Sequence, residues 1–290
     1  MRIDKEIQKQ LLIFQKNEKT EYHIYMKLAR KVQCPENRKI LKSIAEDELK
    51  HYEFWRTLTQ SDVKPNQWKI GIYYLISRIF GFTFGIKLME NGEGDAQDNY
   101  QQLVTLFPEV KNIVQDENDH EETLIRLLDE ERLRYIGSIV LGLNDALVEL
   151  TGALAGLTLA LQNTQLIALT GLITGIAAAL SMAASEYLST KSEDTAQNPM
   201  KASIYTGSAY VMTVIILILP YLIFDNYYLC LALTLTAAIL IIAFFNYYIS
   251  VAKEVPFKNR FLEMAGLSLS VAILSFFIGY LIRMFLGVDV

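Results

Sequence analysis

Long apolar runs fill the second half of the chain, whereas the first half mixes apolar and charged residues at helical spacing. The runs cover roughly residues 135–161, 165–188, 204–224, 227–251 and 262–286. Each is close to the ~20 residues that a helix needs to cross a bilayer. The pattern predicts an all-α protein with two parts: a soluble helical domain over residues 1–132, and a membrane domain of five spans over residues 133–290.

The distribution of charge strengthens this division. Only 6 of the 27 Lys and Arg residues, and only 9 of the 32 Asp and Glu residues, lie beyond residue 134. Neither half has the basic excess that nucleic-acid binding requires, so we expect no nucleic-acid partner. The two cysteines, Cys34 and Cys230, fall in different halves, which favours neither a disulfide nor a zinc site.

The orientation follows from the Lys and Arg residues near the ends of the spans. The turns QNTQ and FDNYY, on one side of the predicted membrane domain, contain none. The Lys and Arg residues near the span ends on the other side, which carries the soluble domain, are Arg132, Arg134, Lys191, Lys201, Lys253, Lys258 and Arg260. The N-terminus has no signal-peptide pattern. We therefore expect an integral membrane protein, with the soluble domain in the cytoplasm and the C-terminus outside.

The first two spans carry acidic residues at depths where acids are costly. Asp145 and Glu149 lie four apart in the first span and share a helix face. Met182 and Glu186 lie four apart in the second span. Carboxylates persist at such depth when they face a partner, a cavity or an ion. A thioether beside carboxylates suits Fe²⁺ or a similar transition metal, so we predict that these four residues line a metal pathway.

The soluble part contains the pattern Glu-x-x-His twice, at Glu48 with His51 and at Glu117 with His120. Each copy follows a helix that offers a further glutamate, Glu18 or Glu93, with a tyrosine seven residues later. Paired Glu-x-x-His helices with one glutamate from each of two other helices form the ligand set of di-iron bundles. The predicted metal ligands are therefore Glu18, Glu48, His51, Glu93, Glu117 and His120.

Three further acids lie close to these residues in the sequence: Glu21, Glu90 and Glu121. They leave room for an extra metal ion or for a shifted ligand. Glu90 competes directly with Glu93, because both can face the interior of the bundle. Glycines on both sides of Glu93 weaken the helix there, each by about 1 kcal/mol.

The apolar stretch 71–86 raises the question of a sixth span, although Arg78 lies in its middle. A span here would place Glu18 and Glu48 across the membrane from Glu117. A shared metal site requires all four helices on one side. We therefore interpret residues 71–86 as the crossover and the start of the third helix, with a composition that suits a membrane surface.

The segments LGLNDALVELTGALAGL and AAALSMAASEYLST resemble the first two spans of the vacuolar iron transporter family. The preceding part resembles rubrerythrins and other ferritin-like proteins, and this fusion is similar to the prokaryotic membrane-bound ferritins. The resemblance implies a ferritin-like four-helix bundle, a metal path lined by Asp145 and Met182, proton-coupled export, a homodimer and a location in a prokaryotic cell membrane. Unlike plant and fungal members, the chain has only KSEDTAQNPMKA between the second and third spans.

Together these features predict an exporter that moves Fe²⁺, or alternatively Mn²⁺, out of the cytosol in exchange for protons. The N-terminal domain would capture or sense the metal, with Fe²⁺/Fe³⁺ at a di-iron site. The alternative is a membrane-anchored di-iron ferroxidase or peroxidase of the rubrerythrin type, whose spans serve as an anchor. The expected partners are the transported ion, protons, membrane lipid and a second copy of the chain.

Overall fold

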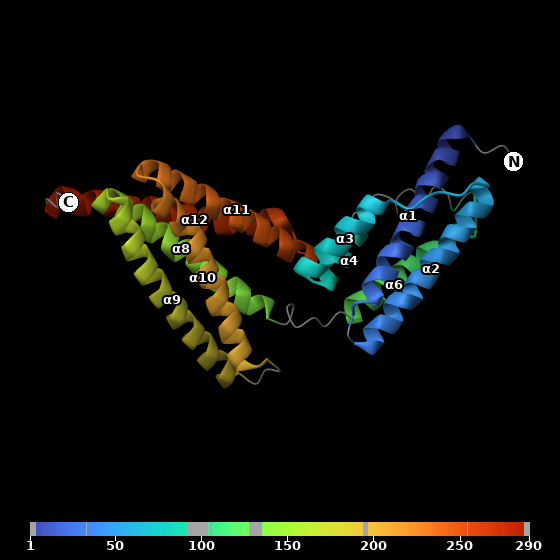
Figure 1. Cartoon of the computed structure of the whole chain (residues 1–290), viewed down its shortest axis with the longest axis horizontal. Coiled ribbons are helices and arrows are strands. Elements are labelled where there is room, and N and C mark those ends of the chain that lie inside the picture. The colour runs from blue at the N-terminus through green and yellow to red at the C-terminus, as the bar shows by residue number, and fades with distance from the viewer. Residues whose placement is uncertain are drawn as a thin grey trace. The chain divides into compact units, whose positions relative to one another are not determined.

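The computed structural model describes residues 4–32, 34–91, 104, 106–127, 135–193, 197–253 and 255–286, and every element among them that has regular structure is an α-helix (Figure 1). Contacts divide the chain into two compact units, Met1–Glu130 and Glu131–Val290. The all-helical prediction is confirmed for the described residues. The assignment of the first unit to the ferritin-like class stays a prediction.

The first unit is built on a hairpin of two long helices, α1 (Lys5–Ala29) and α2 (Pro35–Thr59), which lie side by side (Figure 1). Pro35 suits the first position of α2, where no backbone N–H is required. Apolar side chains from both helices pack between them, including Leu28 and Leu41. The packing of this hairpin fixes the inward faces that carry Glu18, Glu48 and His51, all of which are buried.

The predicted crossover is itself helical, in two pieces, α3 (Gln67–Phe80) and α4 (Phe82–Asn91). Asn66 caps α3 by accepting hydrogen bonds from the backbone N–H groups of Trp68 and Lys69. The break falls at Gly81, whose φ of 104° disfavours any residue with a side chain. The last described helix of the unit is α6 (Val110–Leu127), which carries the second Glu-x-x-His pattern.

The second unit contains five helices that are long and apolar enough to cross a membrane, as predicted. They are α8 (Ile136–Leu161), α9 (Thr164–Ser192), α10 (Pro199–Ile223), α11 (Tyr227–Lys253) and α12 (Phe257–Leu286). Three of them extend beyond the predicted apolar runs by about one turn on the side of the Lys and Arg residues. At the start of α10 the reason is local, because Asn198 caps the helix and Pro199 occupies its first turn.

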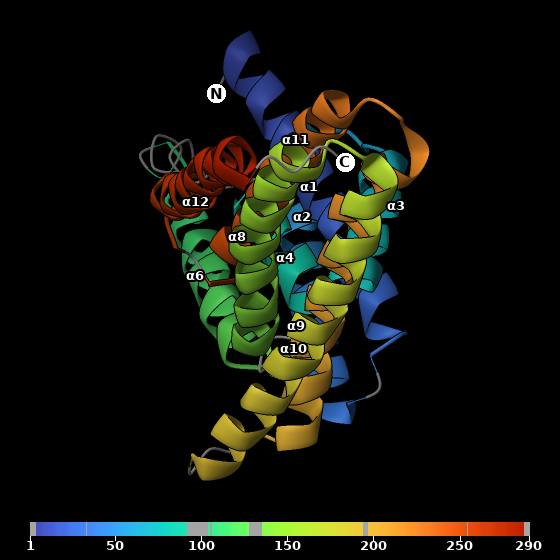
Figure 2. The ribbon, with the colours of Figure 1, turned by 90° about the vertical axis from the view of Figure 1, so that its left-hand side faces the viewer.

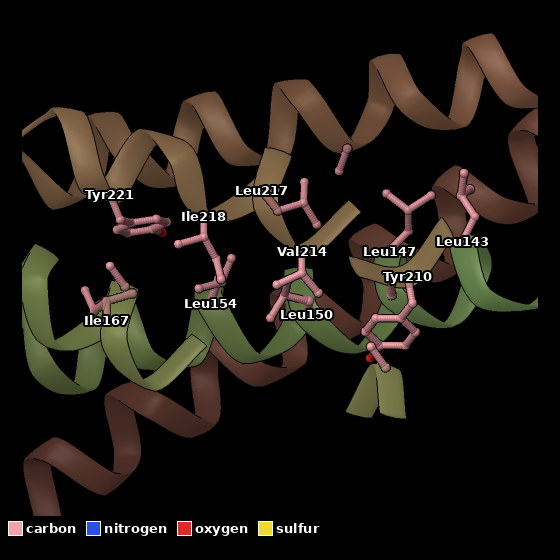
Figure 3. Close-up of a cluster of buried hydrophobic side chains, with 14 of the residues drawn as sticks. Leu143, Leu147, Leu150, Leu154, Ile167, Tyr210, Val214, Leu217, Ile218 and Tyr221 are labelled. Carbon is pink, nitrogen blue, oxygen red and sulfur yellow. The ribbon is translucent and has the colours of Figure 1, made fainter. Parts of the chain in front are cut away.

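Helix α8 is the centre of this unit and packs closely against α10 and α12. Figure 2 shows α9 and α10 beside α8, and Figure 3 shows leucines of α8 meeting apolar side chains of α10. Glycines permit the close approach: a Cβ at Gly142 would collide with the backbone carbonyl of Thr206, and one at Gly279 with that of Gly156. Such contacts between small residues are typical of membrane helices.

Candidate metal centre and membrane cavity

Four buried side chains from three helices converge in the first unit. They are Glu18 on α1, Glu48 and His51 on α2, and Glu117 on α6. One potential ligand atom from each lies within 4.8 Å of the other three. We call these four residues the carboxylate–histidine cluster. It could bind a metal ion, and it brings together four of the six predicted ligands.

Helical spacing explains why α2 contributes two members of the cluster. Residues three apart lie on the same face of a helix, so Glu48 and His51 point together toward α1 and α6. The indole N–H of Trp55, one turn further along α2, donates a 2.9 Å hydrogen bond to Glu18. Trp55 is fully buried, so this bond fixes the position of the Glu18 carboxylate without access for water.

His120 on α6 extends the cluster to a second histidine, and the two imidazole rings lie 6.1 Å apart. The Nδ1 atom of His51 lies 3.2 Å from a Glu117 oxygen and 3.6 Å from a Glu48 oxygen. The Nδ1 atom of His120 lies 3.4 Å from the other Glu48 oxygen. The Glu48 carboxylate therefore lies between the two histidines, where a carboxylate can be shared by two ions.

Two further aspartates, which are not among the predicted ligands, contact the outer nitrogens of the histidines. The Nε2 atom of His51 lies 3.2 Å from Asp116 on α6, and that of His120 lies 3.3 Å from Asp47 on α2. Each aspartate thus reaches across to the histidine of the other helix. The sequence carries a signal for this arrangement, because an aspartate directly precedes the glutamate in both Glu-x-x-His copies.

The pKa values of the cluster reflect crowded acids in a buried space. Burial raises the pKa of Glu48 well above its usual range, and the negative charges of Glu117 and Glu18 raise it further. Burial also raises the pKa of Glu117. For His51, burial lowers the pKa, but the surrounding carboxylates outweigh it and raise the pKa above the ordinary value. Glu48, Glu117 and His51 therefore bind protons more strongly than usual, as expected where a cation belongs. The pKa of Glu18 is lowered instead, because its interactions with His51 and Trp55 outweigh the effect of burial.

Unpaired polar atoms at the centre of the cluster fit a metal. The Nδ1 atoms of both His51 and His120 and one oxygen of Glu48 are buried, and although charged neighbours lie close, none of these atoms forms a hydrogen bond of suitable geometry within the described part of the chain. Buried polar groups are nearly always paired, because an unpaired group costs about 1–3 kcal/mol. If each Nε2 donates its proton to its aspartate, each Nδ1 presents a lone pair to the centre.

The remaining predicted ligands lie apart from this centre or outside the described structure. Glu21 is buried on α1 but is not one of the four clustered side chains. Glu93 lies outside the described residues. Glu90 and Glu121 belong to α4 and α6, but their side chains are not among the described ones. The described ligands therefore come from three of the four helices that were predicted to supply them.

In the membrane unit, Glu149, one of the two acids predicted on the first span, lies beside a cavity of about 430 Å³. Helices α8, α9, α10 and α12 line it, and Glu149 borders it together with the hydroxyl-bearing Tyr210, Thr174 and Ser275. The Tyr210 hydroxyl donates a 2.9 Å hydrogen bond to Glu149. Asp145, one turn away on α8, interacts electrostatically with Glu149.

The two residues predicted on the second span have different surroundings. Met182 on α9 packs against the apolar core of the membrane unit. Glu186, one turn further along α9, accepts a 2.5 Å hydrogen bond from Ser138 near the start of α8. Within the described chain, no hydrogen bond or ion pair joins either residue to Asp145. The metal-path role of these side chains stays a prediction.

Five apolar helices, three of which carry acidic residues, characterise an integral membrane protein. Residues 136–198 match the model of the VIT family, the vacuolar iron transporters. The match covers α8 and α9 and ends at the cap of α10, so it includes all four predicted pathway residues. It suggests membrane transport of a metal such as iron or manganese. No curated protein and no solved structure matches the chain.

Proposed function

We propose that the protein exports a divalent metal, Fe²⁺ or Mn²⁺, from the cytosol in exchange for protons. The observation that carries this proposal is a cavity between membrane helices that is bordered by Glu149, within the segment that matches a metal-transporter family. An acid beside a cavity at this depth is what an ion pathway requires, whereas a simple anchor needs neither. Asp145 and Glu149 would hold the cation and exchange it for protons.

The first unit, in this proposal, captures or senses the metal on the cytoplasmic side. The position of Glu48 between two histidines supports a site for two ions, with His51 and His120 bound through Nδ1. Carboxylate and imidazole ligands suit iron and manganese alike. Bound iron would also supply redox chemistry, which is the basis of the alternative function as a membrane-anchored ferroxidase or peroxidase.

Metal flux into proteoliposomes tests the transport proposal. The substitution Asp145→Asn keeps the volume of the side chain but removes its charge, so we expect it to abolish most of the uptake of Fe²⁺ or Mn²⁺. The matched control is Asp225→Asn, because Asp225 is exposed in the turn between α10 and α11. Wild-type flux through Asp145→Asn would contradict the mechanism.

The same assay separates the roles of the first unit. Glu48→Gln in the full-length chain removes the shared carboxylate and leaves α8 and α9 unchanged. If flux falls with it, the cluster is an obligatory relay. If flux persists while bound metal is lost, the cluster is a store, a sensor or an oxidation site.

A homodimer is the remaining part of the proposal. Glu149 is exposed on α8 even though it lies near the middle of a span. A second copy that covers this face would lower the cost of the exposed acid in lipid. Crosslinking through a cysteine introduced at Ala153, which also borders the cavity, tests this assembly in native membranes. A chain that stays monomeric there would contradict it.

A further inference from the structure

Helix α3 has an apolar outer face that no described part of the chain covers. Trp68, Leu75 and Ile79 are 76%, 54% and 52% exposed, and Ile72 is half-buried between them. The spacing of these four residues places them in one stripe along the helix. The opposite face of α3, with Ile70 and Tyr73, packs into the core of the unit. The stripe is thus an exposed apolar surface on a helix whose other face is well anchored.

The charged residues of α3 and of the segments that flank it in the sequence have one sign only. Residues 63–89 contain Lys64, Lys69, Arg78 and Lys87 and no Asp or Glu, within a half of the chain where acids outnumber bases. Lys69 and Arg78 lie on α3 itself and are exposed. Neither forms an ion pair with a described residue. An amphipathic helix with a basic border and a tryptophan is the kind of surface that binds the interface of an anionic bilayer.

We propose that this face of α3 docks onto the anionic leaflet of the membrane that the second unit spans. The connection between the units keeps this surface in reach. Helix α6 ends at Leu127 and α8 begins at Ile136. The connecting chain can extend at most about 30 Å. The local lipid concentration at α3 is therefore high, and even a weak affinity suffices for docking.

The competing occupant of the stripe is a second copy of the same face. In a symmetric dimer each patch meets its own copy, so Lys69 and Arg78 would approach their counterparts without intervening acids. Anionic headgroups neutralise these charges instead, and each cation strengthens binding to such a surface about five-fold. Charge thus favours lipid over self-association. The consequence is that the first unit rests on the bilayer and holds the carboxylate–histidine cluster near the membrane.

The chain provides its own reporter, since it has only two tryptophans. Trp55 is fully buried and Trp68 is 76% exposed. Acrylamide quenching is measured for the full-length protein in detergent, in nanodiscs of phosphatidylcholine, and in nanodiscs that also contain phosphatidylglycerol. The Trp68→Phe variant gives the contribution of Trp55. We expect the anionic nanodiscs to lower the quenching of Trp68 several-fold, and brominated acyl chains to quench it.

Two variants test whether the apolar stripe and its basic neighbours cause the docking. Leu75→Glu places a charge in the stripe and should restore access of acrylamide to Trp68. Ile13→Glu is the matched control, because Ile13 is also exposed (48%) but lies on α1, away from the stripe. The double variant Lys69→Gln and Arg78→Gln leaves the apolar stripe intact and should weaken docking in anionic lipid, as should high salt.

Two results would overturn the proposal. One is equal access of acrylamide to Trp68 in detergent and in anionic nanodiscs. The other is protection of Trp68 in detergent that disappears on dilution, which would show that a second copy covers the stripe. Neither readout depends on metal transport, so the outcome is separate from that of the proposed function.

Discussion

The substitution Glu48→Gln should have opposite effects on the metal-free and metal-bound protein. The ligand atoms of Glu48 and Glu117 lie within 4.8 Å of each other, and at an effective dielectric constant of 20 two charges at that distance repel by about 3 kcal/mol. Protonation relieves part of this repulsion, as the raised pKa of Glu48 indicates. A neutral amide of the same shape removes the remainder. We expect the variant to stabilise the metal-free first unit by about 1–3 kcal/mol.

Bound metal should make the wild type more stable than Glu48→Gln. At a concentration 100 times its dissociation constant, a ligand stabilises the folded state by about 2.7 kcal/mol. The wild type should gain that amount with Mn²⁺, or with Fe²⁺ under anaerobic conditions, and Glu48→Gln should gain little. The assay is thermal unfolding of the full-length protein, followed by near-ultraviolet circular dichroism and tryptophan fluorescence. A shift of about 5–10 °C in the transition of the first unit corresponds to roughly 2 kcal/mol.

The control for this prediction is Glu53→Gln on the same helix. Glu53 is exposed and forms an ion pair with Arg56. Exposed pairs contribute only about 0–1 kcal/mol, so both metal-free and metal-bound transitions should stay near those of the wild type. If Glu48→Gln destabilises the metal-free unit, or if metal stabilises it as much as the wild type, Glu48 is a structural residue and the reasoning fails.

Three further predictions address the site and the membrane core. Metal binding to the carboxylate–histidine cluster should release protons, because the pKa of His51 is raised. As the pH falls, metal affinity should fall roughly tenfold per pH unit for each proton displaced. Calorimetry in buffers of different ionisation enthalpy measures the number of protons released. Asp116→Ala should lower metal affinity about 10–100-fold, since His51 loses its Nε2 partner. The control Asp119→Ala removes an exposed aspartate of the same helix and should leave the affinity unchanged. Equal affinities of the two variants would contradict the role of Asp116 in positioning His51. Gly142→Ala should destabilise the membrane unit by about 1–3 kcal/mol, because the new Cβ collides with the backbone of α10. The control Gly266→Ala places its Cβ in open space and should not change the stability. Thermal-shift assays in detergent measure both effects.

The helices were predictable because their signals are local and repetitive. Apolar runs of bilayer length gave the number of spans and approximate boundaries for all five membrane helices. The crossover was less accessible, because the break between α3 and α4 depends on the positive φ of one residue, Gly81. Glycine permits that conformation but does not require it. The apolar composition of the crossover did not indicate which of its faces would stay exposed.

The grouping of the predicted ligands was predictable where it follows from fixed spacing along a helix. Glu48 and His51 share a helix face in any α-helix, and so do Glu117 and His120. What the spacing could not give is the pairing across helices, in which Asp116 reaches His51 and Asp47 reaches His120. That pairing depends on how α2 and α6 align in space.

The four residues predicted for the membrane path, three acids and one thioether, are not equivalent once their surroundings are compared. Glu149 and Glu186 each accept a hydrogen bond from a neutral hydroxyl, that of Tyr210 or Ser138. Such a bond offsets part of the cost of an acid in an apolar setting without any cation. Asp145 accepts no hydrogen bond from a described residue. Its carboxylate has the strongest physical requirement for a cation or a proton, so the charge of Asp145 should matter more for flux than that of Glu186.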